Sequence, residues 1–338
     1  MRWGARRVSL FGVGLMAVAG ILSAFSPTWE WLAAYRFVAG VGAAFFFSPA
    51  LSLIATYFPA GTRGPVIGLY NGGFSLGGAL GLVAGAALGA AYGWPAALWV
   101  GGAALLALTI AAVWLLPRPA RPLVAPSVHE IVAGARPILR SRSIWALSAA
   151  LVGFWAAIYV VAQYFTQYAT SVHSLSGVTA ATLASIVVLA SFPGGIVGGW
   201  WAERVKDRRR LIILGTVVCG SLVAAVPFTP VWALGPAFAA LGFLDGMVFA
   251  VLYLIPTYLP EARGESVALG LAIINSIQVS VGSLIAVSFG FLAAGPGYAV
   301  AWVFVGLLTL ILLPLVLFVA PTRRRSRDDS SGLSPATS

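Results

Sequence analysis

Long apolar runs separated by short polar gaps make up most of this 338-residue chain. The runs cover residues 8 to 25, 31 to 58, 65 to 90, 95 to 116, 144 to 169, 177 to 200, 211 to 228, 232 to 257, 265 to 293 and 297 to 320. Each run is long enough to cross a bilayer core as a helix, which takes about 20 residues. The pattern therefore predicts an all-α polytopic membrane protein with ten spans.

Basic residues alternate along the gaps between these runs. Except for Arg36, all of the 20 Lys and Arg residues lie at the N-terminus, in the second, fourth, sixth and eighth gaps, or in the tail after residue 320. Because basic loops stay on the cytoplasmic side, the pattern predicts that both termini are cytoplasmic. We expect a multi-pass protein of the plasma (inner) membrane.

A net charge of +11 would suggest nucleic-acid binding in a soluble protein. Here the charge lies in short loops next to hydrocarbon, where it sets topology and contacts anionic lipid heads. We therefore expect the lipid bilayer, and no nucleic acid, as a partner. The single cysteine, Cys219, lies inside the seventh run and allows neither a disulfide nor a thiolate metal cluster.

The chain contains an internal repeat. The segment LIATYFPAGTRG begins at residue 53 and LIPTYLPEARG at residue 254, so that Thr56 and Tyr57 recur 201 residues later. Runs one to four thus match runs seven to ten, whereas runs five and six have no counterpart before residue 1. The N-terminal segment also imitates a secretory signal, but the repeat matches its apolar run to the span at 211 to 228 and favours a membrane helix.

The loop after the sixth run carries a motif. It reads GWWAERVKDRR from Gly199 and resembles the signature loop of the major facilitator superfamily of secondary transporters, with Lys206 and Asp207 as departures from the family pattern. The start of the first copy, RWGARR, resembles the same loop. The predicted gating-loop residues are Arg2, Gly4, Arg6, Arg7, Gly199, Glu203, Arg204, Arg208 and Arg209. Such a loop can act as a charged latch between halves or serve only as a topology signal.

The resemblance implies a two-half helical bundle with ten transmembrane helices present of an expected twelve. It divides the chain into an N-terminal half at 1–116, a cytoplasmic linker at 117–143, a C-terminal half at 144–320 and a disordered cytoplasmic tail at 321–338. The N-terminal half would then correspond to family helices three to six, and the C-terminal half to family helices seven to twelve. The first two helices of the family would be lacking.

Two charged side chains inside runs are candidates for binding the solute or the coupling ion. Arg36 begins the segment RFVAGVG, which is similar to a family pattern, and lies roughly 9 Å along the helix from Glu30. An arginine at that depth costs about 3 kcal/mol unless it meets water or a partner. Its alternative is snorkelling to the outer interface, toward Glu30. Asp245 is either a proton-coupling or counter-ion group or a neutral, hydrogen-bonded structural aspartate.

Run five carries a polar and aromatic stripe at a spacing of four residues. Trp155, Tyr159, Gln163 and Gln167 share one helical face and suit a cavity wall, although helix packing explains them as well. Asn71, Asn275 and Gln278 either reach the same cavity or act as glue between helices.

Glycines at a spacing of four indicate close helix packing. They are Gly73, Gly77, Gly81, Gly85 and Gly89 in run three, with Gly194 and Gly198 in run six. The resemblance implies that these two helices pack together across the halves. The segment GFSLGGALG also resembles a pattern of drug and proton antiporters, but Gly78 replaces its proline, so it does not by itself indicate export.

Taken together, the residues and the resemblance predict a secondary active transporter of a small solute that works by rocker-switch alternating access. Arg36 favours an anionic or zwitterionic solute moved with protons. The alternatives are a transport-incompetent remnant, a protein that interacts within the membrane, and a drug/proton exporter. The sequence shows no enzyme chemistry, cofactor motif or metal-ligand spacing, and we expect a monomer.

Overall fold

The computed structural model describes residues 4–58, 60–117, 137–202, 204–205, 209–254 and 265–319. Every regular element in these ranges is helical. The helices are α1 (Gly4–Ala24), α2 (Trp29–Tyr57), α3 (Ala60–Tyr92), α4 (Trp94–Leu115), α6 (Arg142–His173), α7 (Gly177–Ala202), α8 (Arg209–Ala225), α9 (Val231–Leu254), α10 (Glu265–Ala294) and α11 (Tyr298–Leu312), with the 3₁₀ segments η1 (Val226–Phe228) and η3 (Leu313–Phe318).

Nine of the described helices are long and apolar enough to cross a membrane, by length and composition. Helices suit this setting because a helix satisfies its own backbone hydrogen bonds where lipid offers none. The prediction of an all-α polytopic membrane protein is confirmed, with the count of ten spans as an approximation.

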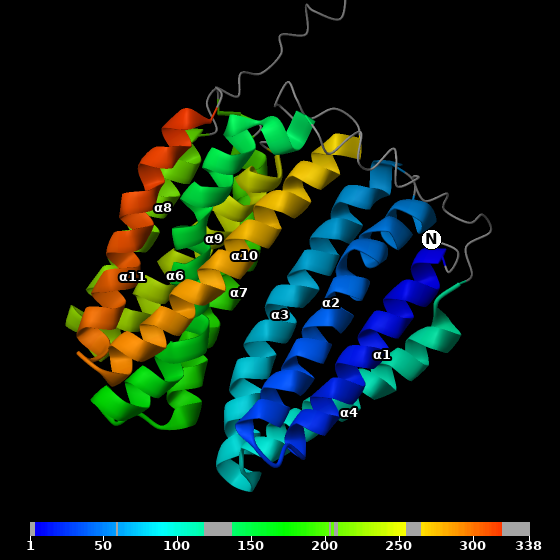
Figure 1. Ribbon diagram of the computed structural model, residues 1–338, viewed down its shortest axis with the longest axis horizontal. Coiled ribbons are helices and arrows are strands. Elements are labelled where there is room, and N and C mark those ends of the chain that lie inside the picture. Colours follow the sequence, from blue (N-terminus) through cyan, green and yellow to red (C-terminus); the bar gives the residue numbers. More distant parts are fainter. Residues whose placement is uncertain are drawn as a thin grey trace, which may run out of the picture. The chain divides into compact units, whose positions relative to one another are not determined.

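The chain divides into two compact units. Unit 1 is Met1–Ser127 with Tyr164–Leu189, and unit 2 is Val128–Gln163 with Ala190–Ser338. Within unit 1, α1 lies between α2 and α4, and α3 packs on α4 and α2. Figure 1 shows α1, in dark blue, running beside α4. The sequence halves at 1–116 and 144–320 stay a prediction.

Unit 2 repeats this internal arrangement. Here α8 lies between α9 and α11, and α10 packs on α11, so α8 takes the part that α1 takes in unit 1. In Figure 1, α8 and α11 run side by side. The recurrence of the same packing in both units supports the internal repeat inferred from the sequence.

Two glycines form the tight turns before matched helices. Gly93 precedes α4 with φ 84°, and Gly297 precedes α11 with φ 107°. Only glycine adopts such angles without strain, so each turn reverses the chain at once. Proline explains the 3₁₀ ends of two predicted spans, because Pro227 and Pro314 stand at the starts of η1 and η3.

Candidate functional site

Arg36 is held by one neighbour from α1. Its Nε donates a hydrogen bond to the hydroxyl oxygen of Ser23 over 3.1 Å. The buried Ser23 hydroxyl donates in turn to the carbonyl oxygen of Ala19 over 2.7 Å. The Arg36 side chain is exposed, and among the described residues Ser23 is its only hydrogen-bond partner.

Glu30 does not form an ion pair with Arg36 in the described part of the chain. Its carboxylate is hydrogen-bonded to Thr28 at the start of α2. Arg36 is thus oriented by a neutral hydroxyl, and no carboxylate of the described residues forms an ion pair with it.

The close approach of α1 and α2 brings the hydroxyl of Ser23 on α1 within hydrogen-bond distance of Arg36 on α2. A methyl group at Gly12 would lie 2.6 Å from the carbonyl oxygen of Gly42, and one at Gly42 would lie 2.7 Å from that of Gly12. Neither helix could carry a side chain at this crossing without separating. Gly42 belongs to the predicted RFVAGVG pattern. At Gly40 of the same pattern, by contrast, a methyl group would meet no described atom within 4 Å.

Asp245 lies half-buried on α9 in unit 2. The structure has no ion pair or hydrogen bond for its carboxylate among the described residues. It is close enough to Cys219 on α8 to interact with it electrostatically, and the Cys219 thiol itself is 3.9 Å from the carbonyl oxygen of Leu241. Asp245 is therefore a carboxyl group without a fixed cation, in a helix that is otherwise apolar.

The backbone beside Asp245 is fixed by α7. A methyl group at Gly246 would overlap the carbonyl oxygen of Ser191 and lie 2.6 Å from the backbone nitrogen of Gly195. Methyl groups at Gly194 and Gly198 would likewise meet the backbone of Phe243 and Met247. The two helices thus cross with their backbones in contact, and this α7–α9 crossing determines where Asp245 can lie.

The aromatic members of the predicted stripe on α6 form a pair. The rings of Trp155 and Tyr159 are stacked, with centroids 4.6 Å apart and an interplanar angle of 17°. Both are half-buried, whereas Gln163 and Gln167 farther along α6 are exposed. The stripe spans both units, because Gln163 ends its segment of unit 2 and Gln167 belongs to unit 1.

The predicted amides of α10 lie together. Gln278 is only 2% exposed, and its Nε2 donates to the Oδ1 of Asn275 over a long 3.4 Å. The side chain of Asn71 lies outside the described residues. A single cavity that takes in Arg36, Asp245, the stripe and these amides stays a prediction.

Three arginines of the described gating-loop residues make contacts near helix ends. Arg6 donates from Nε to the carbonyl oxygen of Leu116 over 3.2 Å and from Nη2 to that of Val113 over 2.5 Å. Arg209 donates to Val319 over 3.0 Å. Arg204 covers the ring of Trp200, with the guanidinium carbon 3.8 Å from the ring centroid.

Other members of the motif show no such contacts or cannot be placed. Gly4 begins α1, Arg7 is exposed, and a methyl group at Gly199 would meet no described atom within 4 Å. Arg2, Glu203 and Arg208 lie outside the described residues. The role of the motif as a latch stays a prediction.

The glycine ladder of α3 faces open space. Among the described residues, methyl groups at Gly73, Gly77, Gly81 and Gly85 would meet no atom within 4 Å, and one at Gly89 would lie 4.0 Å from Cα of Trp94. The residue of α3 that meets α7 within unit 1 is Gly78, where a methyl group would lie 3.2 Å from Val188. The role of the ladder in packing across the halves stays a prediction.

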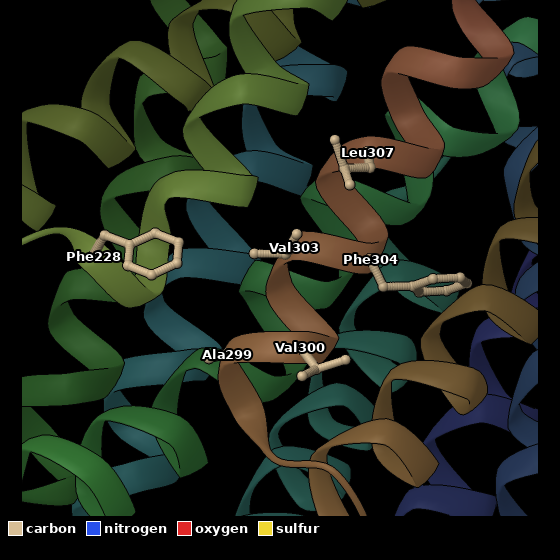
Figure 2. A pocket seen from close by; sticks show the side chains of 6 residues that line it. All are labelled: Phe228, Ala299, Val300, Val303, Phe304 and Leu307. Atoms are coloured by element: carbon tan, nitrogen blue, oxygen red, sulfur yellow. The ribbon is translucent and has the colours of Figure 1, made fainter.

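A hollow of about 360 Å³ lies on the outside of α11. Figure 2 shows its lining, in which Phe228 from η1 faces Val303 and other side chains of α11. The lining residues are all apolar: Phe228, Ala299, Val300, Val303, Phe304 and Leu307. A charged solute would find no polar partner there.

The sequence did not predict two residues that position candidate site residues. Ser23 orients Arg36, and Gly282 on α10 makes room for the indole of Trp155. A serine and a glycine within apolar runs are common, so neither carried a signal of its own.

Known proteins resemble this chain along most of its length. The 4-hydroxybenzoate transporter PcaK of Pseudomonas aeruginosa is 26% identical over 240 residues, which cover 62% of this chain and 54% of that protein. The gallate transporter of Pseudomonas putida is 27% identical over 321 residues, which cover 84% of this chain and 70% of that protein. The chain thus spans about half the length of the first of these relatives.

A solved structure shares the fold. The crystal structure of a D-xylose-proton symporter matches with a TM-score of 0.72 at 16% identity, over 95% of this chain and 82% of that one. The sequence model of the Major Facilitator Superfamily matches residues 1–276. The resemblance seen in the loop motif is thereby confirmed, and this chain belongs to the Major Facilitator Superfamily.

Proposed function

We propose that this chain is a secondary transporter that moves a small organic anion together with protons, by alternating access of a rocker-switch type. The observation that carries the proposal is the guanidinium of Arg36, which has Ser23 as its only partner among the described residues. A buried or membrane-facing cation without a counter-charge is unfavourable by several kcal/mol. An anionic solute that binds there supplies that counter-charge.

The relatives support a carboxylate as the anion. Two of them are named as transporters of 4-hydroxybenzoate and gallate, which are aromatic carboxylic acids. A guanidinium presents a planar fork of N–H donors that matches the two oxygens of a carboxylate. Because Nε of Arg36 is already bound to Ser23, its terminal nitrogens are the groups left for the solute.

Asp245 is the proposed proton carrier. Its carboxyl group lies within a membrane-crossing helix and has no fixed cation among the described residues. Ionisation without a partner is disfavoured in such a place, so the group can take up a proton on one side and release it on the other. Its neighbours Leu241, Gly242 and Gly246 are buried, which limits the water that can reach it.

The orientation follows from charge. Basic gaps alternate with gaps that lack Lys and Arg, which favours cytoplasmic termini. We further propose a monomer in the plasma membrane, with halves at residues 1–116 and 144–320. The stripe from Trp155 to Gln167 and the amides Asn275 and Gln278 would then line the solute path.

Uptake by proteoliposomes tests the proposal. The purified full chain is reconstituted and offered radiolabelled benzoate, a neutral sugar and an organic cation. We expect saturable uptake of benzoate alone. Arg36→Gln should lower it by roughly tenfold or more, because a hydrogen bond to a charged group is worth about 1.5–3 kcal/mol. Arg210→Gln, an exposed arginine at the start of α8, is the control. Uptake limited to the sugar or the cation would overturn the proposal.

A further inference from the structure

The corner at which the chain enters α6 is anchored in the core of unit 2. Residues 137–140 are helical, and Ser141 separates them from α6. Ile138 and Ile144 lie on either side of Ser141, and both are fully buried. A methyl group at Gly270 of α10 would lie 3.4 Å from Cδ1 of Ile144 and 3.9 Å from Cδ1 of Ile138. The hydroxyl oxygen of Ser141 accepts a hydrogen bond from the backbone nitrogen of Ile144 over 3.4 Å, so the corner has a defined conformation.

An aromatic ring is fixed on the surface of the same corner. The indole Nε1 of Trp145 donates a hydrogen bond to the carbonyl oxygen of Leu139 over 2.8 Å, back across the corner. Both side chains lie on the surface, since Leu139 is 50% exposed and Trp145 is 49% exposed. The hydrogen bond therefore holds an apolar ring in one place without burying it.

Two arginines belong to this corner. Arg140 directly follows Leu139, Arg142 begins α6, and both side chains are exposed. Among the described residues neither arginine has a hydrogen bond or an ion pair, and residues 137–202 contain no Asp or Glu. The two arginines are two positions apart, which is at most about 7 Å along the chain. Both guanidinium groups can therefore reach a single anionic group.

The charge pattern predicts that the corner lies at the cytoplasmic boundary of the bilayer. Arg140 and Arg142 belong to the basic fourth gap, and the next apolar run begins at residue 144. Basic gaps stay on the cytoplasmic side, where the membrane carries its anionic lipids. A topology signal needs positive charge alone. It does not account for a ring that is hydrogen-bonded in place beside the two charges.

We propose that this corner, made of Leu139, Arg140, Arg142 and Trp145, binds one anionic phospholipid of the cytoplasmic leaflet. The two guanidinium groups bind the phosphate, because their planar N–H donors match its oxygens. The start of an acyl chain lies on Trp145 and Leu139, at the depth where tryptophan is enriched in membrane proteins. The site does not depend on the proposed transport function.

Native mass spectrometry of the purified full chain in detergent tests the site, because it counts the lipids that remain bound. The chain is titrated with phosphatidylglycerol, or with phosphatidylcholine that has the same acyl chains. The variants are Arg140→Gln, Arg142→Gln and Trp145→Phe. Arg210→Gln, which removes an exposed arginine from the start of α8, is the matched control.

We expect the wild type to bind one phosphatidylglycerol about tenfold or more tightly than phosphatidylcholine. Arg140→Gln and Arg142→Gln should each weaken this binding by about fivefold, the effect of one cation near an anionic surface. Trp145→Phe keeps a ring and loses the bond to Leu139, and it should weaken the binding by about threefold. Arg210→Gln should stay within twofold of the wild type.

Three results would overturn the site. Equal binding of the two lipids by the wild type would show that the lipid's charge is not recognised. A loss in Arg210→Gln as large as that in Arg140→Gln and Arg142→Gln would show attraction by overall charge. Unchanged binding by Trp145→Phe would mean that the fixed ring takes no part.

Discussion

Arg209 donates a hydrogen bond from Nη1 to the backbone carbonyl oxygen of Val319, the residue that directly follows η3, over 3.0 Å. In unit 1, Arg6 donates from Nε to the carbonyl oxygen of Leu116, the residue that directly follows α4. Both bonds join residues 110 positions apart. The first turn of one helix thus caps the last carbonyls of another in each unit, where the negative end of the helix dipole favours a cation.

Loss of either cap should lower stability. Arg6→Ala and Arg209→Ala each leave helix-end carbonyls without their charged donor, and we expect each to cost about 1 kcal/mol. Thermal unfolding of the purified protein in detergent measures the change. Arg7→Ala and Arg210→Ala remove exposed arginines from the same helix turns and should have a smaller effect. Equal effects of all four substitutions would mean that the caps add nothing beyond general charge.

The α7–α9 crossing should tolerate no added carbon atom. Gly246→Ala places a methyl group on the backbone of Ser191 and Gly195, which forces the helices apart. Overpacking of this kind costs typically about 1–3 kcal/mol, so a clear drop in the unfolding midpoint is expected. Gly199→Ala, on the same α7, meets no atom within 4 Å and should be neutral or slightly stabilising. A neutral Gly246→Ala would show that the crossing is looser than described.

Thr309 should contribute through one hydrogen bond between helices. Its hydroxyl oxygen lies 2.8 Å from the carbonyl oxygen of Gly153 on α6 and 2.8 Å from that of Val305 in its own helix. Thr309→Val keeps the shape and removes the bond, and bonds of this kind in membranes average about 0.6 kcal/mol. The control is Thr182→Val, because the Thr182 hydroxyl binds only Val178 of its own helix. A Thr309→Val variant as stable as Thr182→Val would argue against the bond.

Replacement of Asp245 should separate solute exchange from proton coupling. Asp245→Asn keeps the size of the side chain and removes its proton chemistry. We expect the variant to exchange labelled for unlabelled solute across liposomes at near wild-type rates, and to lose accumulation driven by a pH gradient. Loss of both activities together would make Asp245 a structural or solute-binding residue. Full retention of both would remove it from the mechanism.

The sequence predicted the helices well because their ends are chemically marked. Charges, prolines or glycines bound each apolar run, and so α4 (Trp94–Leu115) matches the predicted run from 95 to 116 closely. The helix α6 continues past the predicted residue 169 to His173, because Thr170 and Ser171 are polar without breaking a helix.

The sequence does not predict which helices pack against each other. The ladder of α3 and the pair Gly194 and Gly198 share the spacing of four residues. Yet methyl groups at the pair would meet the backbone of α9, while methyl groups at Gly73, Gly77, Gly81 and Gly85 would meet no described atom within 4 Å. Spacing says that a close approach is allowed, and the partner depends on how the rest of the unit packs.

The partners of the candidate site residues depend on the same packing. Arg36 stood out as a charge inside an apolar run, but its link to Ser23 exists because α1 and α2 cross at Gly12 and Gly42. The helix caps depend on packing too, and Arg6 in unit 1 and Arg209 in unit 2 take the same part in them.

The central claim is that the chain transports an organic anion together with protons. Acidification of the liposome lumen after an organic acid is added outside tests this claim most directly. Liposomes with a trapped pH indicator, with and without the reconstituted chain, receive external 4-hydroxybenzoate. We predict that the lumen acidifies faster with the chain than without it, and that Arg36→Gln and Asp245→Asn each lose this gain. The same rate of acidification in liposomes with and without the wild-type chain would contradict the account.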